Sequence, residues 1–205
     1  PDAVAEADGF LGAFNAVPPQ LNGVAVMEKR DYNLRKAWNL LDGTESSLTL
    51  PRSQVLYYKL EGGTVLGTVP YLLLNIPAGN EYYVASKYQF NTMAPYEFAS
   101  DKYVSLHTRF YLGGTILDNI PLLKKLGWRE RLSFNAYWGS MNNANKEYNK
   151  HSNFNLIGKY PFLEASLGIE NIFHIMSIEY YRRLNYLGNP YAKKDGIYLG
   201  ITLSF

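Results

Sequence analysis

The ten C-terminal residues alternate strictly between apolar and small or polar side chains. Apolar residues occupy every second position from Ile197 to Phe205, and glycine, tyrosine, threonine or serine stands between them. Because successive side chains of a strand point to opposite faces, this pattern predicts a strand with one apolar face. The same period of two recurs in residues 55–64, 103–113, 131–139, 162–170 and 175–186. The sequence therefore predicts an all-β, antiparallel protein.

Composition narrows the class of protein. The net charge is +2, from 20 basic and 18 acidic residues, so no strong basic field indicates a nucleic-acid partner. The absence of cysteine excludes disulfides, thiolate metal sites and cysteine nucleophiles. The sequence contains no run of 18 apolar residues, so no transmembrane helix is predicted. The predicted strands have the ~9–11 residues that a tilted strand needs to cross a bilayer. Tyrosine is abundant, as expected at a membrane–water boundary. A transmembrane barrel is favoured, with a soluble, lipocalin-like ligand binder as an alternative.

The connections between the predicted strands alternate in length. If the C-terminus is periplasmic, residues 65–101, 140–160 and 187–195 are external, and residues 115–130 and 171–174 are periplasmic. Long outer loops and short periplasmic turns are typical of outer-membrane barrels. Residues 115–130 are long for a turn, and they are expected to contain a short amphipathic segment on the inner rim.

The N-terminal part is harder to assign. Residues 31–41 fit either a loose strand or an amphipathic helix. Residues 1–20 are predicted to be a periplasmic lead-in or plug segment, and residues 21–205 a barrel domain, taken as the C-terminal part of a larger barrel. Arg182 interrupts the apolar face of residues 175–186 and is expected to face a partner or the membrane interface.

Four motifs carry a family resemblance. They are GGTVLGTVPY (residues 62–71), YEFASDKYVSL (96–106), NIPLLKKLGWRE (119–130) and ASLGIENIFHI (165–175). Together they resemble, in order, an uncharacterised outer-membrane family of Bacteroidota that couples a carboxypeptidase-regulatory-like β-sandwich to a C-terminal barrel. A more distant similarity links IPLLKKL to the barrel-assembly surface-antigen group. The resemblance implies a cell outer-membrane location, although the β-sandwich is absent and the family barrel is longer.

The C-terminus also resembles the closing strand of bacterial outer-membrane barrels. Such strands end in an aromatic residue that addresses the insertion machinery, and here the corresponding residues are Ile201, Leu203 and Phe205.

Two candidate sites follow from the barrel interpretation. The faces turned away from lipid collect a polar lumen network, expected to be a packed interior or, alternatively, a solute pathway: Lys59, Glu61, His107, Arg109, Glu164, Glu170, Glu179 and Arg183. Four of these, on sequential strands, are expected to form one ion network: Glu164, Glu170, Glu179 and Arg183.

The long loop 65–101 is the second site, because loops of this length are usually functional or disordered and its aromatic residues argue against disorder. It is expected to plug the barrel mouth, to dock a partner or to stack on sugars, through Tyr71, Tyr82, Tyr83, Tyr88, Phe90 and Tyr96.

No catalytic set is recognisable. The three histidines have no metal-ligand spacing, no serine lies in a nucleophile elbow, and no phosphate-binding loop is present. No enzyme activity, metal or cofactor is therefore expected. The predicted function is that of a structural or accessory subunit of an outer-membrane assembly for protein or lipoprotein biogenesis or transport. Its expected partners are the bilayer, lipopolysaccharide and other outer-membrane proteins, and the alternative function is a passive or substrate-specific transport channel.

Overall fold

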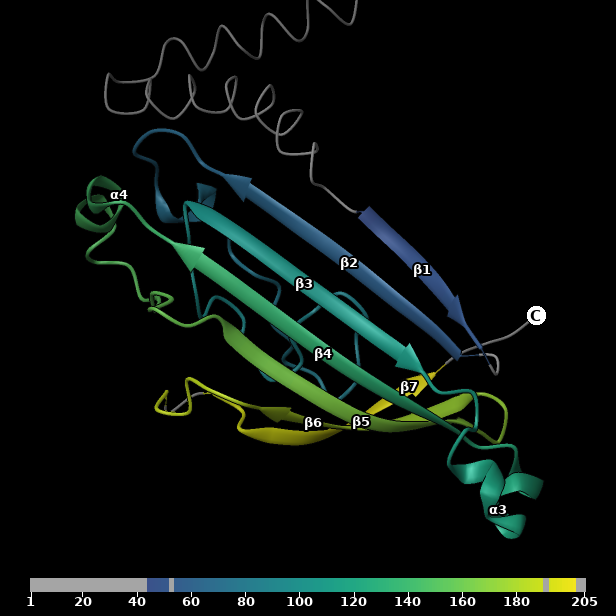
Figure 1. Cartoon of the computed structure of the whole chain (residues 1–205). Coiled ribbons are helices and arrows are strands. Elements are labelled where there is room, and N and C mark those ends of the chain that lie inside the picture. The colour runs from purple at the N-terminus through teal and green to yellow at the C-terminus, as the bar shows by residue number, and fades with distance from the viewer. Residues whose placement is uncertain (1–43, 52–53, 190–191, 202–205) are drawn as a thin grey trace, which may run out of the picture.

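A computed structural model describes residues 44–51, 54–189 and 192–201. In these residues the protein is all-β, with seven strands and four short helical segments (Figure 1). The strands are β1 (Thr44–Leu50), β2 (Gln54–Thr64), β3 (Lys102–Tyr111), β4 (Arg129–Ser140), β5 (Phe162–Ile172), β6 (Met176–Arg183) and β7 (Asp195–Ile201). The helical segments are η1 (Tyr71–Leu73), η2 (Leu117–Asn119), α3 (Pro121–Leu126) and α4 (Asn143–Tyr148).

The strands form one antiparallel sheet in chain order, from β1 to β7. The all-β, antiparallel prediction is confirmed, and each of the six predicted strands corresponds to one of β2 to β7. β1 was not predicted. The described sheet is not closed, because β1 and β7 lie at the two ends of the strand order.

The connections alternate between the two ends of the sheet. The end that carries residues 65–101, α4 and the β6–β7 connection is called the loop end, and the opposite end, which carries α3, is called the turn end (Figure 1). α3 confirms a short helical segment within residues 115–130. The helix is capped at its C-terminus by Gly127, whose φ of 66° is left-handed. No helix in the described residues is long and apolar enough to cross a membrane. The predictions for residues 1–20, residues 31–41, Leu203 and Phe205 lie outside the described residues.

The sheet has a buried polar face and an exposed apolar face. Figure 1 shows that the sheet curls and that residues 65–101 lie within the curl. We call the face covered by this segment the inner face and the opposite one the outer face. The main hydrophobic cluster lies between segment and sheet, and it includes Phe90, Phe98, Tyr137 and Phe162.

Candidate functional site

The predicted lumen residues all lie on the inner face. One row of the ladder runs across five strands and places these residues opposite one another in turn: Lys59, His107, Asn135, Glu164 and Arg183. A second row contains Arg109 on β3, and the remaining members alternate with outward-facing residues along β2, β5 and β6: Glu61, Glu170 and Glu179. The alternation of apolar and polar residues in the sequence therefore placed all eight of these residues on the same face of the sheet, as the structure does.

The ion pairs differ from the predicted single network. Arg131 of β4 pairs with both Glu179 and Glu170, and its Nη1 lies 3.4 Å from a Glu170 oxygen. Arg183 instead forms a bidentate pair with Glu97 of segment 65–101, with N–O distances of 2.5 and 3.0 Å. The prediction that Glu164, Glu170, Glu179 and Arg183 pair with one another was wrong, because the covering segment supplies its own carboxylate to Arg183.

Glu164 is held by uncharged donors. Its carboxylate accepts hydrogen bonds from the backbone N–H groups of Asn91 (2.9 Å) and Thr92 (2.8 Å), from the Thr92 hydroxyl (2.7 Å) and from the Asn135 amide (2.8 Å). The residue is fully buried. A buried carboxylate is tolerated when hydrogen bonds replace its hydration. Glu164 thereby ties segment 65–101 to the centre of the sheet.

Segment 65–101 also reaches the edge of the sheet. Its backbone pairs with Leu199 of β7 through two hydrogen bonds of 2.8 Å, from Leu199 N–H to Tyr83 and from Ala85 N–H to Leu199. Lys193, in the β6–β7 connection, lies over the rings of Tyr83 and Tyr198. Burial there lowers the pKa of the Lys193 ammonium, and the nearby Glu81 carboxylate opposes this shift. The segment therefore spans the inner face from its middle strands to β7.

The predicted docking residues divide into two groups. Tyr82, Tyr83 and Tyr96 are well exposed, and Tyr88 is moderately exposed. Phe90 is buried between the segment and the sheet, which is the position that the plug alternative expects and leaves it out of reach of a partner. The Tyr71 ring stacks on Phe154 at 5.1 Å and is partly covered.

Part of the inner face beside β2 and β3 stays open. A cavity of about 310 Å³ is lined there by Lys59, Glu61, His107 and neighbouring residues. The imidazole of His107 packs on Phe90 at 4.5 Å between ring centroids, and its Nδ1 has no hydrogen-bond partner among the described residues. Lys59 and Glu61 form an ion pair. In the described parts of the chain, no group of three or more potential ligands could hold a metal ion.

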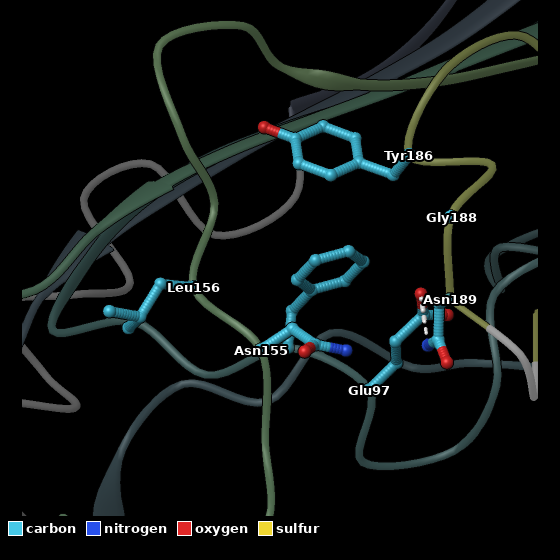
Figure 2. A pocket seen from close by; sticks show the side chains of 7 residues that line it. Glu97, Asn155, Leu156, Tyr186, Gly188 and Asn189 are labelled. Atoms are coloured by element: carbon cyan, nitrogen blue, oxygen red, sulfur yellow. Dashed lines mark hydrogen bonds between the residues drawn. The ribbon is translucent and has the colours of Figure 1, made fainter.

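A second hollow lies at the loop end of the sheet (Figure 2). The ring of Tyr186 lies on one side, the hydrogen-bonded Glu97 and Asn189 lie on another, and Asn155 lies beside Glu97 (Figure 2). This hollow has a volume of about 370 Å³, and an adjoining one of about 420 Å³ also contains Glu97, Asn155 and Asn189. We call the two together the rim hollows.

Several residues of these sites were missed from the sequence. Arg131 shares the face of Ser133 on β4, so the alternation contained the signal that would have found it. Glu97, Asn91 and Thr92 belong to an irregular segment, where no period indicates which side chain turns inward.

A match to a known protein family covers residues 43–150 of the chain. Residues 43–150 match a family described as "Family of unknown function (DUF5686) C-terminal domain", and this span is more than half of the chain. The chain belongs to this DUF5686 family. No curated protein and no solved structure matches the chain.

The DUF5686 match covers a defined part of the site. It includes β1 to β4, the whole of segment 65–101 and α4, together with three of the four sequence motifs. Strands β5 to β7, which carry Glu164 and Arg183, follow the matched span. The covering segment is therefore part of the DUF5686 domain itself.

Proposed function

We propose that this chain forms part of the wall of a β-barrel in the cell outer membrane. In this proposal it is a non-enzymatic structural or accessory subunit of an assembly for protein or lipoprotein biogenesis or transport. The single observation that carries the proposal is the reversed polarity of the two sheet faces.

The reversal is seen most clearly on β5 to β7. Leu167, Ile197 and Ile201 point outward and are 60%, 62% and 71% exposed. Glu179 and Arg183 point inward and are 1% exposed. A large exposed apolar surface on a water-soluble protein is unfavourable and marks an interaction surface. Lipid tails satisfy such a surface, and an outward apolar band with a polar interior is the arrangement of transmembrane barrels.

The ends of the strands fit the same proposal. Arg182 faces outward one residue before the end of β6 and opposite Asp195, the first residue of β7. An arginine at that level reaches the membrane–water boundary at modest cost. Bacterial barrels have at least about eight strands, so closure needs at least one strand beyond the seven described.

A structural role is favoured over an open conduit. Segment 65–101 covers the inner face and is held there by Glu164 and by the pair between Arg183 and Glu97. A wall whose inner face is covered by its own chain, except beside β2 and β3, is unsuited to free passage of solutes. Exposed aromatic residues such as Tyr82 and Tyr83 provide a surface for a protein partner.

Extraction from membranes tests the proposal. Cells that produce the full-length protein are washed with salt and alkali, and the residue is then extracted with mild detergent, sized and analysed by mass spectrometry. The proposal predicts release by detergent alone and a stable complex with other outer-membrane proteins. Release without detergent would contradict the membrane location, and a lone particle with steady conductance in planar bilayers would favour the channel instead.

A further inference from the structure

The rim hollows combine ring faces with amide groups. Tyr186 and Phe98 lie in the first hollow with Asn155 and Asn189, and Tyr96 lies in the second. The ring centroids of Phe98 and Tyr186 are 5.4 Å apart, in an edge-to-face arrangement. Each volume lies within the range of about 300–1,000 Å³ typical of small-molecule sites. A mainly apolar hollow with a few polar groups fits a ligand that has both apolar faces and hydrogen-bonding groups.

The lining of the hollows offers no unpaired charge to an ionic ligand. Among the described residues that line them, Glu97 is the only charged side chain. All four acceptor positions of its carboxylate are used, by the two Arg183 nitrogens, the Ala94 N–H and the Asn189 amide. Glu97 is therefore neutralised and acts as a positioning residue. The ligand that suits this lining is neutral.

The walls are rigid before any ligand arrives. The Tyr186 hydroxyl accepts a hydrogen bond of 2.8 Å from Gly158 N–H and donates to the Tyr160 carbonyl, so the orientation of the ring that lines the first hollow is fixed. Asn155 N–H donates to the Glu97 carbonyl at 2.8 Å, and this bond holds together two residues that line both hollows. A preorganised site binds with a smaller entropy cost.

Two of the five non-glycine residues with a positive φ in the described chain lie at the hollows, and the other three lie at the β5–β6 turn. Tyr186 has a φ of 55° and Tyr96 a φ of 60°, and each lines one of the two hollows. A positive φ is a genuine outlier for bulky residues and is energetically unfavourable. Such strain is retained mostly at ligand sites and switch regions.

We propose that the rim hollows bind a neutral carbohydrate, with one sugar unit in each. The flat C–H faces of a pyranose stack on an aromatic ring such as Tyr186. Sugar hydroxyls both donate and accept hydrogen bonds, and the Asn155 side chain offers both an N–H₂ donor and a carbonyl acceptor. The Asn155 side chain is exposed and lines both hollows, so a sugar can reach it.

Ligand-observed NMR on the full chain tests the proposal. The protein is held in a zwitterionic detergent, because maltoside and glucoside detergents carry the sugar under test. The probes are maltose, cellobiose, lactose and methyl mannoside, with glucuronate as the charged comparison. The proposal predicts saturable binding of at least one neutral probe and weaker or absent binding of glucuronate.

Three variants make the test specific. Asn155→Leu, at an exposed position, and Tyr186→Ala should each weaken binding of the neutral probe about tenfold, equivalent to about 1.4 kcal/mol. Tyr148→Ala is the matched control, because Tyr148 is an exposed tyrosine outside both hollows. Circular dichroism confirms that each variant keeps its strands, and Asn155→Leu keeps the test decisive if Tyr186→Ala does not fold.

Competition separates two sources of sugar. Polysaccharide released from lipopolysaccharide that displaces the probe at a lower concentration than any free disaccharide would identify a membrane glycan, and the reverse order would identify a free sugar. Either result supports the proposal. Absence of binding by every neutral probe, binding of glucuronate alone, or unchanged binding in both Asn155→Leu and Tyr186→Ala would overturn it.

Discussion

Replacing Glu164 with alanine should release segment 65–101 from the inner face. The change removes the acceptor of four hydrogen bonds and leaves three buried donors without that acceptor: the backbone N–H groups of Asn91 and Thr92 and the Asn135 amide. An unpaired buried donor costs about 1–3 kcal/mol, so the expected loss is about 4 kcal/mol if water enters part of the vacated space. That is a large share of the usual folding stability of about 5–15 kcal/mol.

Two measurements on the full chain in detergent check this expectation. Urea titration followed by tryptophan fluorescence gives the free energy of unfolding, and limited proteolysis reports access to segment 65–101. Glu164→Ala should lower the free energy and expose the segment to cleavage. Glu147→Ala is the control, because Glu147 is exposed and, among the described residues, forms an ion pair only with Lys150 at the surface, so its loss should change stability by less than about 1 kcal/mol. Unchanged stability and unchanged proteolysis in Glu164→Ala would refute the role of Glu164 as the anchor.

Two further predictions concern the inner face. Arg183→Met leaves the buried Glu97 carboxylate without its cation and should cost about 3–5 kcal/mol in the same titration. Adding Glu97→Gln should recover part of that loss, and a double variant no more stable than the single one would contradict the pairing. Gly168→Val should cost about 1–3 kcal/mol, because a Cβ at Gly168 would collide with the Glu179 side chain. Gly188→Ala is its control, since nothing lies within 4 Å of the added Cβ and stability should not change.

The strands could be predicted from the sequence because their alternation records two different environments. Residues of β5 such as Glu164 and Leu167 face opposite sides of one sheet, so the period of two assigns both strand and face. β1 was missed because its sequence, TESSLTL, has only two apolar side chains, too few to establish a period.

The arrangement of the covering segment could not be predicted. Its contacts depend on long-range partners, as in the hydrogen bond from Asn91 N–H to Glu164 across 73 positions. Irregular backbone has no period, so nothing in the sequence distinguished the buried Phe90 from the exposed Tyr82. The rim hollows were missed for the same reason, because they form where three separate connections meet.

The central claim is that the outer face contacts lipid, and fluorescence quenching tests it most directly. The chain contains no cysteine, so each introduced cysteine carries the only thiol label. Leu167→Cys and Ile197→Cys place a fluorophore on the outer face, and Tyr148→Cys places it on the exposed surface of α4. In reconstituted vesicles, we expect brominated lipids to quench the two outer-face labels and aqueous iodide to quench only the label at position 148. Quenching of the outer-face labels by iodide and not by brominated lipid would contradict the account.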